Sequence, residues 1–203
     1  FPLLRVVVRR AELGYGGPRH GTHYDLTASC PFCGSGARQA SPLRVTKVPK
    51  NGDIFQTLDR ELMVSERIKK EFVRADISGV ELRQIQSARD LWLLPWFQVL
   101  PQYEMPLMDE TTDGLVRDHF CPRCRRDGYF EENLRVRYNE QLSRTDELPD
   151  VVRTRELFGN SVIRSPFEQS SFAAPLILVN SRVLDVLEAT RVRDVEFDPV
   201  CFV

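Results

Sequence analysis

The chain has 203 residues, enough to bury a sizeable core in one large domain or two small ones. Its 28 basic and 29 acidic residues leave a formal net charge of −1, so it lacks the overall basic field that drives non-specific binding to nucleic acid or membranes. Hydrophobic residues make up 42%, as in ordinary globular proteins, and no apolar run reaches the length of a membrane span.

The first half of the chain alternates short strand candidates with one helix. A β-branched run over residues 3–9 predicts a buried strand that ends at a glycine-rich loop. Residues 24–28, 42–48 and 80–85 are further strand candidates. Ser65 is placed to cap a helix that runs to about Ala75, because Glu66 follows it and Ile68, Phe72 and Val73 form an apolar stripe.

The most aromatic stretch covers residues 91–101 and contains Trp92 and Trp96. Two tryptophans this close could form a binding surface, but large aromatic side chains mainly supply buried area, which favours core packing. Pro95 and Pro101 lack a backbone donor, so they predict an edge strand or an extended loop here.

The second half continues with strands and one more helix. Residues 115–120 predict a strand, and residues 129–138 predict its hairpin partner. Residues 139–150 are polar and form the best candidate for a linker. Beyond it, residues 175–179 predict a buried strand, Asn180 or Ser181 can cap a helix, and residues 195–203 predict a terminal strand in which Cys201 is a small buried hydrophobe.

Two short cysteine pairs organise these elements. Cys30 and Cys33 enclose two residues, as do Cys121 and Cys124, and each pair has proline after its first cysteine. Two residues between thiols let both sulfurs face one ion, so four thiolates at this spacing predict one tetrahedral Zn²⁺ site. Because 87 residues separate the inner cysteines, the metal would clamp distant parts of the chain. Free thiols in such pairs fit a reducing compartment, which predicts a cytoplasmic location.

Other interpretations of the cysteines remain open. Cys30 and Cys33 alone resemble a glutaredoxin active site, although the following Gly34-Ser35-Gly36 opposes the helix start that such chemistry needs. The thiols could also be buried without a metal. A histidine could replace one cysteine ligand, since His20 and His23 precede the first pair and His119 precedes the second.

The elements and the cysteines together predict the architecture. We expect an α+β, β-rich fold of antiparallel sheets with a zinc-ribbon-like module and few helices. Residues 1–145 are expected to form a zinc-knuckle β-rich domain, and residues 150–203 a C-terminal α+β segment that can pack into the same fold. Gly34 can close the first knuckle at positive φ, whereas Arg125 occupies the equivalent place in the second, so that turn must differ or be strained.

Catalytic signals are scarce, and we expect a protein that is not an enzyme. No nucleophile elbow, zinc-protease helix, phosphate-binding loop or dinucleotide fingerprint occurs in the sequence. Arg123, Arg125 and Arg126 on the second knuckle could contact phosphates, solvent, neighbouring carboxylates or an acidic protein partner.

The motifs resemble those of the double-CXXCG motif proteins, a paralogous family abundant in myxobacteria. The matching blocks are Cys30-Pro31-Phe32-Cys33-Gly34, Gly79-Val80-Glu81-Leu82, residues 96–101, residues 112–117, and residues 121–130, which end in Asp127-Gly128-Tyr129-Phe130. Residues 175–179 and 195–200 also look similar, so the resemblance covers most of the chain. Arg125 departs from it, since the second motif should carry glycine there.

The resemblance implies a cytoplasmic immunity protein that binds and neutralises a cognate toxin, because some family members protect kin cells in this way. The contact surface is then expected around the second knuckle and the loop before residue 115: Arg123, Arg125, Arg126, Asp109, Glu110 and Asp113. The alternative function is a zinc-ribbon nucleic-acid-binding protein, which the balanced charge disfavours. A thiol oxidoreductase that uses Cys30 and Cys33 is a third hypothesis.

Overall fold

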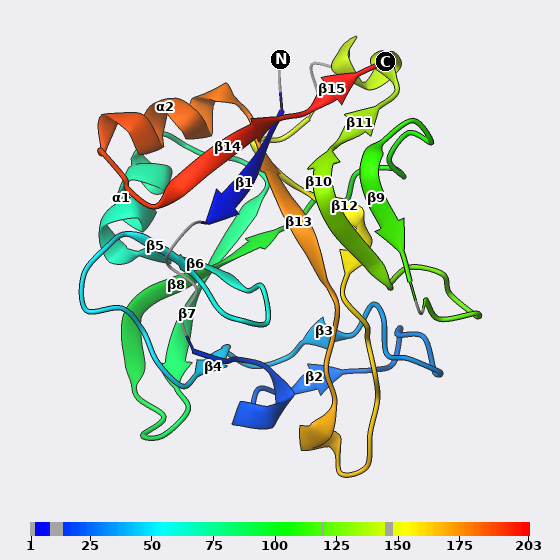
Figure 1. Cartoon of the computed structure of the whole chain (residues 1–203). Coiled ribbons are helices and arrows are strands. Elements are labelled where there is room, and N and C mark those ends of the chain that lie inside the picture. Colours follow the sequence, from blue (N-terminus) through cyan, green and yellow to red (C-terminus); the bar gives the residue numbers. More distant parts are fainter. Residues whose placement is uncertain (1–2, 9–13, 119, 145–147) are drawn as a thin grey trace.

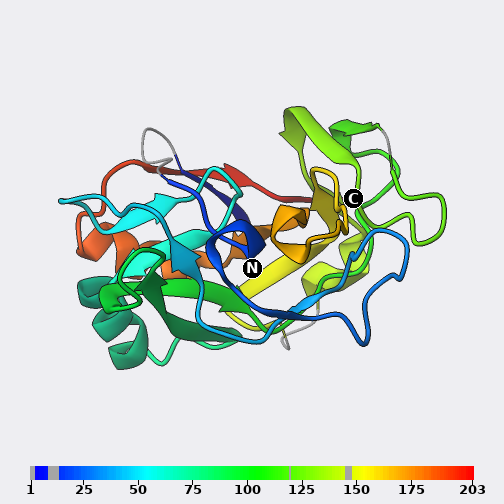
Figure 2. The ribbon, with the colours of Figure 1, turned by 90° about the horizontal axis from the view of Figure 1, so that it is seen from below.

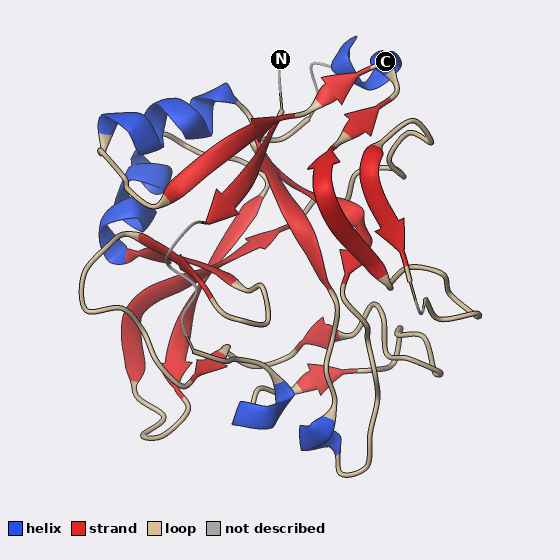
Figure 3. Cartoon of the chain, viewed as in Figure 1, coloured by secondary structure: helices blue, strands red, loops and turns tan. Residues whose placement is uncertain are grey.

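The computed structural model describes residues 3–8, 14–118, 120–144 and 148–203. Within them the chain is rich in β-structure and carries two α-helices, as expected, with strands curling around a common core (Figures 1 and 3). Most strand pairs are antiparallel, and only the short β4–β7 and β11–β15 pairs among the described residues are parallel. The two smaller ribbons described below carry four of the five cysteines. A further two-residue pair joins β11 (Arg137–Tyr138) to β15 (Cys201–Phe202).

A four-stranded sheet joins the two ends of the chain. Its order is β12 (Val151–Phe158), β13 (Ala174–Val179), β1 (Leu4–Val8) and β14 (Val195–Pro199). Strand β1 lies between two strands from beyond residue 150, so the predicted N-terminal and C-terminal parts share this sheet. The predicted boundary falls partly on residues 145–147, which lie outside the described residues.

A five-stranded sheet forms the second layer and corrects one prediction. Its order is β4 (Arg44–Val45), β7 (Val80–Ser87), β8 (Leu93–Pro101), β6 (Leu62–Ser65) and β5 (Ile54–Gln56). Strand β8 is therefore interior, and the expectation of an edge strand or loop was wrong. Proline is tolerated because β6 pairs only with residues 96–98 of β8, and the β7 register shifts beside Pro95.

The two tryptophans have opposite environments. Trp96 is buried and packs edge-on against Phe55, with ring centroids 4.7 Å apart, which confirms core packing for this residue. Trp92 lies at the turn between β7 and β8 and is 76% exposed, so core packing was wrong for it.

Both α-helices begin at the caps that the sequence indicates. The Ser65 hydroxyl accepts a hydrogen bond from the Ile68 amide at the start of α1 (Glu66–Arg74). The Asn180 side chain accepts one from the Arg182 amide at the start of α2 (Ser181–Ala189). Both helices lie at one end of the molecule, and β9 and β10 lie at the other (Figures 1 and 2). Shorter 3₁₀ turns cover Pro18–His20, Glu140–Arg144 and Phe167–Gln169.

The core divides according to the alternation of side chains along the strands. On β13, Val179 faces the cluster that also contains the helix residues Ile68 and Val183, whereas Leu178 faces a second cluster around Tyr138 and Phe158. A third cluster, around Phe55 and Trp96, covers the other face of the five-stranded sheet. Each sheet is thus buried on both faces over part of its area.

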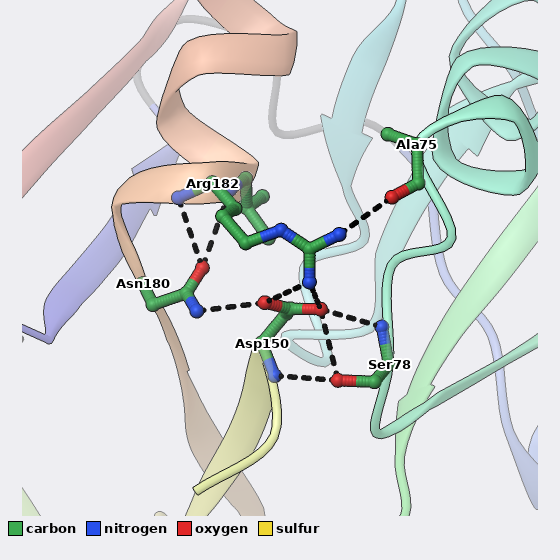
Figure 4. A network of polar contacts seen from close by, with 6 residues as sticks. Ala75, Ser78, Asp150, Asn180 and Arg182 are labelled. Carbon is green, nitrogen blue, oxygen red and sulfur yellow. Dashed lines mark hydrogen bonds and ion pairs between the residues drawn. The ribbon is translucent and has the colours of Figure 1, made fainter. Parts of the chain in front are cut away.

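A buried carboxylate fastens the layers together. Asp150, which is 3% exposed, accepts hydrogen bonds from the Ser78 amide and hydroxyl, the Asn180 side chain and the Arg182 guanidinium (Figure 4). Arg182 also donates to the Ala75 carbonyl at the end of α1. One side chain thereby joins both helices, the start of β12 and the segment before β7.

Candidate metal centre

Each cysteine pair lies in the loop of a two-stranded ribbon. Strands β2 (Tyr24–Asp25) and β3 (Arg38–Gln39) flank the first pair, and β9 (Asp113–Arg117) and β10 (Tyr129–Arg135) flank the second. The hairpin partner predicted for residues 115–120 is confirmed by the antiparallel pairing of β9 with β10. The two ribbons present their loops to each other, which brings segments 91 residues apart into contact.

The four thiols converge to the dimensions of one metal site. The Sγ atoms of Cys33 and Cys124 are 3.6 Å apart, and those of Cys30 and Cys121 are 3.9 Å apart. All four sulfurs lie within 4.8 Å of one another. A tetrahedron with metal–sulfur bonds of about 2.3 Å has sulfur–sulfur edges of about 3.8 Å. Cys30, Cys33, Cys121 and Cys124 could therefore hold one metal ion without a large rearrangement.

The two knuckles make the same turn with different residues. The Gly34 amide donates to the Cys30 carbonyl at 2.8 Å, and the Arg125 amide donates to the Cys121 carbonyl at 3.0 Å. Gly34 has φ 85° and Arg125 has φ 53°, so both occupy the left-handed region. The second turn is thus built like the first, and Arg125 carries the strain that a side chain brings to this conformation.

Burial changes the pKa values of the thiols. It raises the pKa of Cys33, a shift that the hydrogen bond with the Ser35 hydroxyl and the one from the Ser35 amide offset in part, and burial likewise raises the pKa of Cys124. Cys30 is also desolvated, but hydrogen bonds from the Cys33 and Phe32 backbone outweigh this and lower its pKa to about 7. A divalent cation would supply the positive charge that four clustered thiolates need.

Two contacts outside the cysteines hold the knuckles in place, and neither was predicted. Buried Asp127 accepts hydrogen bonds from the Cys121 amide at 3.1 Å and the Ser161 amide at 2.8 Å, so it ties the second knuckle to the segment before β13. At the first knuckle, Gly34 faces Ile163 and Phe172 so closely that a Cβ atom would lie 2.8 Å from each. Asp127 belongs to the motif block of residues 121–130. Its partner Ser161 lies 34 residues further along the chain, so no local sequence pattern indicates their contact.

The remaining candidate ligands lie elsewhere or outside the described residues. Among the described residues, the metal-binding group includes no histidine. His20 is in a 3₁₀ turn beside Tyr15, and His23 is exposed, whereas His119 lies outside the described residues. Cys201 is exposed, so its predicted burial was wrong; β15 presents it outward at the end of the chain.

The predicted contact residues separate into two groups at opposite ends of β9. Arg123, Arg125 and Arg126 follow the strand on the second knuckle, whereas Asp109, Glu110 and Asp113 lie at or before its start (Figure 1). Arg126 is engaged with Glu104 at 2.6 Å, and Asp113 with Arg137 at 2.6 Å. Arg123 and Arg125 are exposed, and no ion pair involves either side chain within the described part of the chain.

The exposed tip of the first knuckle places an aromatic side chain beside the arginines of the second knuckle. Phe32 is 69% exposed and directly precedes Cys33, just as Arg123 directly precedes Cys124. Because the Cys33 and Cys124 sulfurs are 3.6 Å apart, the two tips lie side by side. We call Phe32, Arg123 and Arg125 the knuckle-tip surface.

Neither of two comparisons with known proteins identifies a relative. No protein-family model matches the chain, and a search of the curated proteins returns no match either. Among the described residues, no helix combines the length and the apolar character needed to cross a membrane.

Proposed function

We propose that Cys30, Cys33, Cys121 and Cys124 bind one structural Zn²⁺ in a zinc-ribbon-like module. Four sulfur ligands in a tetrahedral arrangement favour zinc among the divalent ions, and four protein ligands leave no open position for a reacting water. The two ribbons each supply one knuckle, which is the arrangement typical of a zinc ribbon. The spacing of the four sulfurs is the observation that supports this proposal most directly.

On this scaffold, we propose that the protein is a non-enzymatic immunity protein of the double-CXXCG type that acts in the cytoplasm. The motif blocks support the family, and the knuckle-tip surface supports a protein partner. Exposed aromatic and arginine side chains are enriched at the energetic centres of protein interfaces. Phe32, Arg123 and Arg125 are such residues, and a metal that fixes both loops would preorganise them. The partner would be a cognate toxin with an acidic face.

Co-expression with any toxin encoded by a neighbouring gene tests the proposal. We expect rescue of growth and a complex that survives size-exclusion chromatography. Phe32→Ala and the pair Arg123→Ala with Arg125→Ala should each weaken binding at least tenfold, or about 1.4 kcal/mol. Arg89→Ala on the exposed β7–β8 turn is the matched control and should bind like the wild type. Absence of both rescue and complex would count against the immunity function.

A second candidate function, nucleic-acid binding, is favoured by one feature beside the metal centre. Arg117, Arg125 and Arg155 line a pocket of ≈ 240 Å³ that also includes Cys124. Such a cluster could contact phosphates, and the affinity would then fall steeply with salt concentration. A gel shift at low salt that disappears by about 200 mM salt would support this candidate, and no shift at low salt would remove it.

A further inference from the structure

A cleft in the described part of the chain lies between the two main sheets and the first cysteine ribbon. It has a volume of ≈ 510 Å³ and is lined by residues from β3, β6, β7, β8, β12 and β13. This volume is in the range of small-molecule sites. The cleft excludes Phe32, Arg123 and Arg125, so its role is independent of the knuckle-tip surface.

One acidic side chain in the cleft lacks a cationic partner. Glu61 is half-buried, and its carboxylate accepts one hydrogen bond, from Gln98 at 2.7 Å. Gln98 is itself 1% exposed and exchanges hydrogen bonds of 2.9 Å with Gln39. No salt bridge engages Glu61 in the described part of the chain, whereas the other two glutamates of the cleft, Glu81 and Glu104, each pair with arginine. Glu61 therefore retains acceptor capacity toward the cleft.

The cationic side chains of the cleft, in contrast, outnumber the carboxylates that line it. Arg126 and Arg153 both pair with the same oxygen of Glu104, at 2.6 and 3.4 Å, so two guanidinium groups share one carboxylate. Five arginines and three glutamates line the cleft, and Arg60 pairs with Glu131 outside this lining, so the remaining groups leave a net charge of +1 when all are ionised. Such a field attracts an anion and repels a simple amine, even though Glu61 alone would favour the amine.

The wall of the cleft also offers an aromatic surface. Phe172 and Tyr24 line it and pack against each other, with ring centroids 4.8 Å apart. Flat aromatic rings bind well against such a surface. The cleft thus combines an excess of guanidinium groups, an aromatic wall and one carboxylate with spare acceptor capacity.

We propose that this cleft binds a phosphorylated ligand that carries N–H donors away from the phosphate, in the class of nucleoside monophosphates with an amino-bearing base. The phosphate is held by Arg126 and Arg153, which match its geometry in bidentate contacts. The N–H donors of the base bind Glu61, and the ring lies along the wall formed by Phe172 and Tyr24. A bare phosphate would leave Glu61 unused, and a nucleoside would leave the arginines unused.

Calorimetric titration with three probes tests the ligand class. We use guanosine monophosphate, guanosine and inorganic phosphate with the full chain loaded with zinc. Guanosine monophosphate should bind at least tenfold more tightly than either of the other two, since it makes both sets of contacts. Equal affinity for guanosine monophosphate and inorganic phosphate would overturn the proposal, because the cleft would then be an anion site only.

Substitutions within the cleft test which residues bind the base and which bind the phosphate. Glu61→Gln should weaken guanosine monophosphate about tenfold and leave phosphate binding unchanged, whereas Arg153→Gln should weaken both about tenfold. Glu81→Gln is the matched control, because Glu81 lines the same cleft but pairs with Arg83, and it should bind like the wild type within about twofold. Circular dichroism and zinc content verify that each variant is folded. Wild-type affinity in a folded Glu61→Gln variant would also overturn the proposal.

Discussion

Two groups of side chains join segments of this chain that are far apart in the sequence, and they do so through different interactions. The four thiols join ribbons 91 residues apart at one end of the molecule. Asp150 joins Ser78, 72 residues before it, to Arg182, 32 residues after it, beside the helices (Figure 4). The thiols could hold an ion from outside, whereas Asp150 finds its partners within the chain.

The difference shows which part of the fold each group of side chains supports. Asp150 lies among apolar clusters that the sheets and helices already form, so it adds specificity to a core with stability of its own. The cysteine loops, described for residues 26–37, 118 and 120–128, contribute few side chains to those clusters, so the proposed metal would replace the missing core. We therefore expect metal loss to be local and severe, and Asp150 loss to be global and moderate.

Metal removal should give the largest effect. A structural zinc contributes on the order of 10 kcal/mol in small zinc domains, so chelation or Cys33→Ser should unfold the two cysteine loops. The measurement is zinc per chain by elemental analysis, one for the wild type and none for the variant, together with protease sensitivity within residues 26–37.

Cys201→Ser is the matched control for this experiment. Cys201 is exposed and does not belong to the thiol cluster, so the variant should keep one zinc and resist protease. A metal-free wild type with protected loops would contradict the role assigned to the metal, and activity in an insulin-reduction assay would instead support a redox dithiol.

Asp150→Asn should have the second largest effect. The amide keeps the shape of the side chain, but it loses the charge opposite Arg182 and cannot accept all the hydrogen bonds that the carboxylate accepts. We expect a loss of about 3 kcal/mol in the free energy of unfolding, measured with urea and the same wherever the probe is placed. Asp185→Asn on the exposed side of α2 is the control and should stay within about 0.5 kcal/mol of the wild type.

The same carboxylate makes stability depend on pH in a defined direction. Burial disfavours the Asp150 carboxylate, but hydrogen bonds from Ser78 and Asn180 and the charge of Arg182 outweigh it and lower its pKa. A lowered pKa means that this stabilisation is present above the unfolded value of about 3.9 and is lost as the pH falls through the folded value. Asp150→Asn should therefore flatten the acid limb of the stability curve below about pH 4. An unchanged limb would contradict the assignment.

The local parts of the fold were predictable from sequence, whereas among the long-range contacts discussed above only the convergence of the thiols was. Ser65 and Asn180 mark helix starts because a cap needs only its next three residues. The convergence of the thiols followed from spacing and metal geometry alone. The interior position of β8 depends on how far β6 extends beside it. The role of Asp150 depends on Ser78 and Arg182, which lie 72 and 32 residues away in the sequence. No periodicity in the sequence reports such distances.

The two knuckles allow a finer comparison within the thiol cluster. Gly34→Ala should destabilise the first knuckle by about 2 kcal/mol, because φ is positive and the new methyl group would lie 2.8 Å from Ile163 and Phe172. Gly36→Ala separates these causes: its φ is 88°, but the nearest atom to its Cβ is 3.8 Å away. We expect about 1 kcal/mol for this control, from the backbone alone, by thermal unfolding. Equal losses would mean that packing against residues 163 and 172 contributes nothing.

Arg125→Gly should give the smallest effect and the opposite sign. Glycine removes the cost of holding a side chain at φ 53°, so the second knuckle should gain up to about 1 kcal/mol, less the entropy that glycine adds to the unfolded chain. Arg123→Gly is the control, since Arg123 is exposed on the same knuckle without positive φ and should lose stability or stay unchanged. If Arg125→Gly gains stability but weakens the toxin complex, a residue strained in the fold is kept for its contact with the partner. A loss of stability instead would mean that Arg125 makes a favourable contact near Cys124 that outweighs its strain.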